Sequence, residues 1–128
     1  MKEKRLTIRI KRPARDVFWF TMTPANTPKW VESIVEEKTN EWPTRLGTIY
    51  RNRNKQGVWT EYKVTKFKEN EMFEFAAAES SYHVRYTFRP IDENSHEFEY
   101  YEWVDEGKLE EPFTMEILER LKRVVENL

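Results

Sequence analysis

The chain of 128 residues has no cysteine, only three glycines and only two histidines. Without cysteine it can form neither disulfides nor thiolate metal sites, and it has no thiolate nucleophile. Three glycines provide no glycine-rich loop for binding phosphate. The two histidines, His83 and His96, fit no usual metal-ligand spacing. The sequence therefore predicts neither a metal site nor another cofactor.

An excess of either charge and a long apolar run are also missing. The chain has 22 basic and 23 acidic residues, so it has no basic surplus with which to neutralise a nucleic acid backbone. No stretch approaches the roughly 20 apolar residues of a membrane span. The opening MKEKRLTIRI is charged and alternating, unlike a signal peptide. These features predict a cytoplasmic protein with no membrane span and no nucleic acid partner.

Aromatic residues are abundant instead. Five Trp, six Tyr and eight Phe make up 15% of the chain, although hydrophobic residues as a whole make up only 38%. Large rings can fill the core of a thin sheet protein, and Tyr and Trp also suit a partly wet cavity because they carry polar groups. Both interpretations stay open at this point. With no repeat and no flexible linker, residues 1–128 are predicted to form one domain.

The order of elements follows from hydrophobic periodicity. Leu6, Ile8 and Ile10 alternate with polar residues, as in a strand with one buried face. Helical spacing begins behind Pro13, and prolines 24 and 28 limit how far that helix can extend, which places Trp30 in or just after a short helical turn. Six further strands are predicted at about residues 33–38, 48–54, 58–68, 72–78, 82–90 and 96–104.

The last segment has a different period. An apolar stripe with charged residues opposite predicts an amphipathic helix of about 16 residues and about 24 Å. The stripe consists of Phe113, Ile117, Leu118, Leu121, Val124, Val125 and Leu128. The whole pattern predicts an α+β fold, in which a strongly twisted antiparallel sheet of about seven strands follows two short helices after its first strand. The terminal helix is the element large enough to cover the apolar face of this sheet.

This order of elements, the opening IRIKRPARDVFWFTMTPANTPKW, the segments RLGTIYR and VWTEYKVTKF, and the closing helix resemble the SRPBCC superfamily. That superfamily shares the helix-grip fold of START-type lipid carriers, birch-pollen-type allergens and polyketide cyclase/dehydrase-like proteins, and the last group looks closest. The resemblance implies that the C-terminal helix lies across the concave face of a curved seven-stranded sheet. It also implies a cavity between them for a small hydrophobic ligand, with Trp30 anchoring the short helices against its rim.

Strand alternation indicates which side chains face that interior. Tyr82, Val84, Tyr86 and Phe88 share one face of their strand, and the ring-bearing face should point inward. Two strands contain a conflict. Trp59 and Phe67 are out of phase with Val58, Tyr62 and Val64, and Tyr101 and Trp103 are out of phase with Phe98 and Tyr100. Either a β-bulge shifts the phase or the convex face is partly covered as well.

The predicted ligand-binding residues combine this inward set with the rim and the terminal helix. They are Trp30, Tyr50, Tyr62, Phe75, Tyr82, Tyr86, Tyr100, Leu118 and Leu121. Arg51 and Glu102 are the charged candidates for the interior. No Ser/His/Asp arrangement is recognisable, since Ser80, Ser81 and Ser95 lie in predicted turns, and no catalytic residue is assigned.

The sequence therefore favours the binding of a small hydrophobic or aromatic ligand. Two alternatives remain. One is an enzyme of the polyketide cyclase or dehydratase type, which needs little chemistry beyond positioning and one Tyr, Arg or Glu for proton transfer. The other is a protein-interaction domain of the chaperone-activator type, in which the outer face matters more than the interior.

Overall fold

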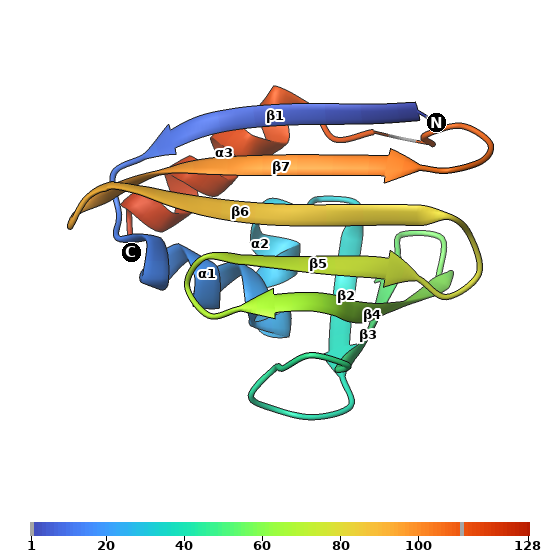
Figure 1. The fold of residues 1–128 in the computed structure, drawn as a ribbon. Helices are drawn as coiled ribbons and strands as arrows, with labels where there is room; N and C mark the ends of the chain where they lie inside the picture. Colours follow the sequence, from blue (N-terminus) through green and yellow to red (C-terminus); the bar gives the residue numbers. More distant parts are fainter. Residues whose placement is uncertain (1, 111) are drawn as a thin grey trace.

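The computed structural model describes residues 2–110 and 112–128. Its strands form one antiparallel sheet with the order β1-β7-β6-β5-β4-β3-β2 (Figure 1). The strands are β1 (Lys2–Ile10), β2 (Ile34–Thr39), β3 (Ile49–Asn54), β4 (Trp59–Lys68), β5 (Met72–Ala77), β6 (Tyr82–Asp92) and β7 (Ser95–Val104). The predicted seven-stranded antiparallel sheet is confirmed.

The helical segment after β1 has to cross the sheet, because β1 and β2 occupy opposite edges. It consists of α1 (Ala14–Met22), a 3-10 turn at Pro24–Asn26 and α2 (Thr27–Trp30). Pro13 stands directly before α1, where its missing N–H removes no helical hydrogen bond. Thr23 is extended and Pro24 follows it, which ends α1. The two short helices predicted after the first strand are confirmed.

The C-terminal helix α3 (Met115–Glu126) lies on the same side of the sheet as α1 and α2 and packs against β1 and α2 (Figure 1). It is shorter than the predicted 16 residues. Thr114 before it is extended, so Phe113 lies outside the helix, and Leu128 lies beyond its end and is exposed. None of the helices within residues 2–110 and 112–128 is long and apolar enough to cross a membrane.

The core at one end of the sheet is built around Phe18 of α1. This side chain is fully buried and meets the rings of Phe67, Phe73 and Phe88 edge-on, with centroids 5.7, 5.5 and 5.5 Å away. Edge-to-face packing suits the charge distribution of aromatic rings and adds to the effect of burial. Rings from β4, β5 and β6 therefore pack α1 tightly against the sheet at this end.

A β-bulge explains one of the two conflicts in strand phase. The pairing of β4 with β5 shifts between Val64 and Lys66. The extra residue brings Phe67 back to the inner face opposite Phe73, whereas regular alternation would have placed Lys66 there. Trp59 keeps its outward position and is exposed.

The second conflict has the other explanation, since the convex face is covered around Tyr101 and Trp103. The guanidinium of Arg5 lies 4.1 Å from the centroid of the Tyr101 ring, and that of Arg85 lies 5.4 Å from the Trp103 ring. The imidazole of His83, on the neighbouring strand β6, stacks on the ring of Trp103. Arginine stems and ring faces thus shield aromatic residues that face away from the core.

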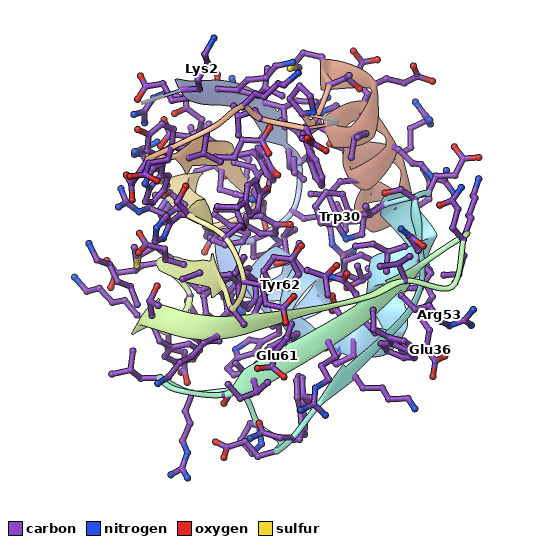
Figure 2. The ribbon with its side chains drawn as sticks, turned by 90° about the vertical axis from the view of Figure 1, so that its right-hand side faces the viewer. Lys2, Trp30, Glu36, Arg53, Glu61 and Tyr62 are labelled. Carbon is purple, nitrogen blue, oxygen red and sulfur yellow. The ribbon has the colours of Figure 1, made fainter. Side chains whose placement is uncertain are left out.

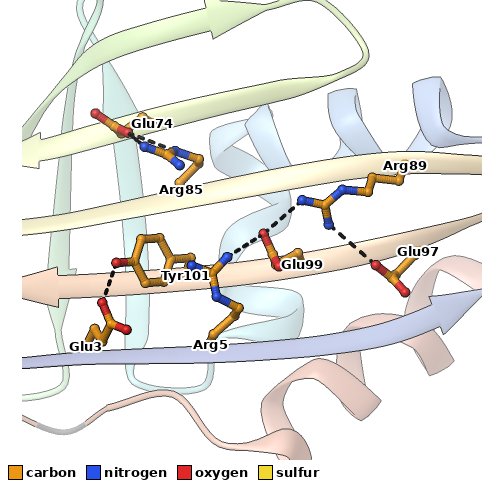
Figure 3. Close-up of polar contacts among 8 residues, drawn as sticks. All are labelled: Glu3, Arg5, Glu74, Arg85, Arg89, Glu97, Glu99 and Tyr101. Atoms are coloured by element: carbon orange, nitrogen blue, oxygen red, sulfur yellow. Dashed lines mark hydrogen bonds and ion pairs between the residues drawn. The ribbon is translucent and has the colours of Figure 1, made fainter.

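Two carboxylates on this outer face are buried and paired with arginine (Figure 3). Glu99 lies 3.1 Å from Arg5 and 3.2 Å from Arg89, and Glu74 accepts two hydrogen bonds from Arg85, at 2.9 and 2.8 Å. Both carboxylates are more than 90% buried, so their negative charge needs these partners. The outer face therefore contributes to stability as well as to solubility.

We expect Arg85→Met to lower the free energy of unfolding by about 2 kcal/mol, because it leaves the carboxylate of Glu74 buried without its cation. The double variant Glu74→Met/Arg85→Met should recover at least half of that loss, since it removes the unpaired charge. Urea titration followed by circular dichroism measures both values. A double variant as unstable as Arg85→Met would instead assign the cost to the lost packing of the guanidinium on Trp103.

Candidate functional site

The half of the interior that α1 leaves unfilled contains a cavity of about 80 Å³, here called the inner cavity. Its wall comes from α1, α2, the beginning of β2 and the inner faces of β3 to β7. The lining residues are Thr21, Thr27, Val31, Ile34, Glu37, Tyr50, Asn52, Tyr62, Phe75, Tyr82, Val84, Tyr86, Tyr100 and Phe113. Most are apolar or aromatic, and no lysine, arginine or histidine is among them.

The inner cavity adjoins an open groove of about 550 Å³, here called the outer groove. Both are lined by Val31, Ile34, Asn52, Tyr62, Tyr82 and Phe113. The groove continues between the β5–β6 turn and the connection from β7 to α3, over Ala77, Glu102 and Val104. Ligand pockets usually enclose about 300–1,000 Å³. The inner cavity alone is below this range, whereas the cavity and the groove together reach it.

Six of the nine predicted ligand-binding residues line the inner cavity. They are Tyr50, Tyr62, Phe75, Tyr82, Tyr86 and Tyr100. Trp30, Leu118 and Leu121 are fully buried but lie outside its lining. Trp30 packs edge-on against Tyr86 and Phe113, both 5.9 Å away between ring centroids, so it supports two rings of the wall from behind. Figure 2 shows Trp30 and Tyr62 toward the interior and Glu61 on the opposite side of β4.

The two charged candidates for the interior, Arg51 and Glu102, lie on opposite faces of the sheet. Arg51 points outward, where its Nε donates to Glu61. Glu102 faces inward from β7 and is only 2% exposed. Its Oε1 accepts hydrogen bonds from the hydroxyls of Tyr82 at 2.8 Å and Tyr100 at 3.0 Å, and its Oε2 accepts one from the backbone N–H of Phe113 at 2.9 Å. Within the described residues, Glu102 has only these neutral donors and no cation.

A second inward carboxylate, Glu37, was missed from the sequence. The pairing of β2 with β3 shifts between Ile34 and Glu36, and this bulge turns Glu37 to the side of Ile34 and opposite Asn52. The Thr27 hydroxyl donates to Glu37 Oε1 at 2.7 Å. Burial raises the pKa of Glu37 to about 7, with the hydrogen bonds from Thr27 and Asn52 opposing the rise. No residue type in this stretch indicates a bulge.

The tyrosine hydroxyls of the inner cavity differ in their hydrogen-bond partners. That of Tyr50 donates to the Met22 carbonyl at 2.7 Å and contacts the Thr44 hydroxyl. By contrast, the hydroxyls of Tyr62 and Tyr86 have no hydrogen-bond partner among residues 2–110 and 112–128, although Tyr86 is only 9% exposed. Burial, and then the charges of Glu37 and Glu102, raise the pKa of both phenols. They are therefore neutral and available to donate or accept.

The histidines lie outside this site. His83 stacks on the outer face, and His96 is fully buried with its Nδ1 2.8 Å from the Arg12 carbonyl oxygen. Burial lowers the pKa of His96, which favours its neutral form in the folded protein. The described part of the chain holds no cluster of three or more His, Asp or Glu side chains placed for a metal ion.

Comparison with known sequences gives one family. A family model described as polyketide cyclase / dehydrase and lipid transport matches residues 1–128, the whole chain. No curated protein matches the chain by sequence.

Solved structures share the fold at low sequence identity. The protein XoxI from Bacillus cereus superposes with a TM-score of 0.76 at 12% identity, covering 97% of this chain and 95% of XoxI. A START superfamily protein from Mycobacterium smegmatis gives 0.71 at 18%, covering 98% and 94%. The di-domain ARO/CYC BexL from the BE-7585A biosynthetic pathway gives 0.67 at 14%, covering 81% of this chain and 36% of BexL. At these identities, the likeness shows a common fold.

Proposed function

Because the chain belongs to the polyketide cyclase/dehydrase and lipid transport family of the SRPBCC superfamily, we propose that it binds one small, largely apolar molecule in the inner cavity and the outer groove. The observation that supports this function most is the continuity of the two spaces. An enclosed hollow lined by aromatic rings opens into a groove through six shared residues. Such a site can bury an apolar body while a few polar groups fix its orientation.

An enzyme of the cyclase or dehydratase type is the second candidate. The observation in its favour is Glu37, whose pKa of about 7 lets it both give and accept a proton near neutral pH. Incubation of the protein with its co-purified molecule would then give a product that mass spectrometry resolves, and Glu37→Gln would form none. A molecule that stays unchanged with the wild-type protein would support binding alone.

Native mass spectrometry of the freshly purified protein, followed by solvent extraction, tests the binding function. We expect one bound molecule per chain. The variant Ala77→Phe should lose it, because Ala77 lies on the inner face and lines the outer groove. Ala76→Phe is the matched control, since the neighbouring residue of β5 faces the other side of the sheet, opposite Lys63 and His83.

A thermal-shift assay gives an independent readout of binding. With 2-phenylethanol or 2-phenylethylamine at about ten times its Kd, the stabilisation should be about 1.4 kcal/mol, or about 5 °C in Tm. Wild-type protein that carries no molecule and whose Tm responds to neither compound would refute the binding function.

A further inference from the structure

The charges around the site are almost all of one sign. Glu37 is the one charged residue of the inner cavity, and Glu102, Glu106, Glu110 and Lys108 line the outer groove. Glu37 and Glu102 also raise the pKa of the tyrosines between them, so both act on the same enclosed space. The site therefore has a negative potential, and charge interactions are stronger at its buried positions than in bulk water.

The carboxylates of the inner face differ from the buried carboxylates of the outer face in their partners. On the outer face, Glu74 is paired with Arg85, and Glu99 is paired with Arg5 and Arg89. On the inner face, the described partners of Glu37 and Glu102 are hydroxyl, amide and backbone N–H groups. Buried charges are normally paired with an opposite charge. The inner face thus has two acceptors whose cation is not supplied by the described chain.

An independent observation is the hydroxyl of Tyr86. This side chain is nine-tenths buried, lines the inner cavity, and has no hydrogen-bond partner within residues 2–110 and 112–128. A ligand group with a hydrogen-bond donor or acceptor can therefore pair with this hydroxyl in the cavity. The same cavity is lined by the rings of Tyr62, Phe75 and Tyr82, and aromatic rings attract cations because their faces carry partial negative charge.

From these observations we propose that the ligand is a primary amine, with its ammonium group in the inner cavity and its apolar body in the outer groove. This inference rests on the proposed binding function and specifies its ligand. An ammonium group offers three donors and no acceptor, which matches carboxylates that only accept. The inner cavity of about 80 Å³ accommodates the ammonium group and the first methylene groups, and the larger groove accommodates the rest.

Isothermal titration calorimetry with matched probes tests this proposal. The probes are 2-phenylethylamine, which is cationic at pH 7.5, 2-phenylethanol, which has nearly the same shape without charge, and the anion phenylacetate. We expect the amine to bind at least about 10-fold more tightly than the alcohol, because charge-assisted hydrogen bonds are stronger than neutral ones. The anion should bind more weakly than the alcohol, because it meets the same negative potential.

Four isosteric variants assign the effect to the inward carboxylates. Glu102→Gln and Glu37→Gln should each weaken amine binding by about 10-fold or more and change alcohol binding by less than about threefold. Glu36→Gln and Glu61→Gln remove neighbouring charges on the outer side, where Glu36 pairs with Arg53 and Glu61 with Arg51 (Figure 2). Both controls should bind the amine like the wild-type protein. If Glu102→Gln fails to fold, Glu37→Gln alone decides.

The outcomes separate the two proposals. Equal affinity of the wild-type protein for amine and alcohol would overturn the amine ligand and leave the binding function intact. An amine preference that survives in both Glu37→Gln and Glu102→Gln would also overturn it. Wild-type protein that binds none of the three probes and carries no co-purified molecule would overturn the binding function and the amine ligand together.

Discussion

Phe18→Ala is expected to lower the free energy of unfolding by about 4 kcal/mol, a large part of the stability of a domain of this size. Phe18 is fully buried and touches three rings of the sheet, from Phe67, Phe73 and Phe88. These rings are themselves held by their strands, so they cannot collapse into the space that the missing ring leaves. The loss therefore includes the cost of a cavity as well as the lost burial.

Urea titration and thermal melting followed by circular dichroism measure this effect. The matched control is Leu46→Ala, a truncation of similar kind at a side chain that is 63% exposed, and it should change stability by less than about 0.5 kcal/mol. A Phe18→Ala variant within about 1 kcal/mol of the wild-type protein would show that this end of the core repacks.

The sequence predicted the fold because its signals are local and agree with one another. Alternation in 82–90 and 96–104, the prolines around Trp30 and the apolar stripe of the last helix each specify one element, and the family resemblance specifies how they assemble. The resemblance is confirmed by the match over residues 1–128 and by the START superfamily neighbour. Alternation also placed five tyrosines and Phe75 on the inner face, and all six line the inner cavity.

What the sequence could not predict depends on single-residue irregularities. The bulge in β2 decides that Glu37 faces inward, and the bulge in β4 decides the same for Phe67. The position of a bulge depends on how a strand pairs with its neighbour, so the sequence pattern of one strand does not predict it. Phe113 is similar. Its place in the apolar stripe suggested the last helix, but the chain is extended at Thr114, and Phe113 stacks on Tyr100 with centroids 4.1 Å apart.

These irregularities have a common consequence for the site. The bulge in β2 and the extended segment before α3 bring Glu37 and Phe113 into a wall that regular strands and a longer helix would have built from other side chains. These two departures from regular structure supply the acidic group of the inner cavity and its stacked ring.

The pH dependence of stability tests the placement of Glu37. Its ordinary pKa is 4.5, and burial raises the pKa to about 7 in the folded protein. Between these values the folded state binds more protons than the unfolded state, so the free energy of unfolding should fall as the pH rises from about 5 to about 8. At about 1.4 kcal/mol per pKa unit, the loss amounts to at most about 3 kcal/mol. Below pH 4.5 Glu37 is protonated in both the folded and the unfolded state, so it should no longer make the free energy of unfolding depend on pH.

Urea titrations of the wild-type protein and of Glu37→Gln at pH 5 and pH 8 isolate this contribution. Glu37→Gln is always neutral, so it should gain up to about 3 kcal/mol relative to the wild-type protein between the two pH values. Burial lowers the pKa of His96, which acts in the opposite direction and cancels in the comparison because both proteins contain it. Glu36→Gln, on the outer side, should follow the wild-type protein. Parallel pH profiles for the wild-type protein and Glu37→Gln would mean that Glu37 reaches water and that its pKa is not raised in the folded protein.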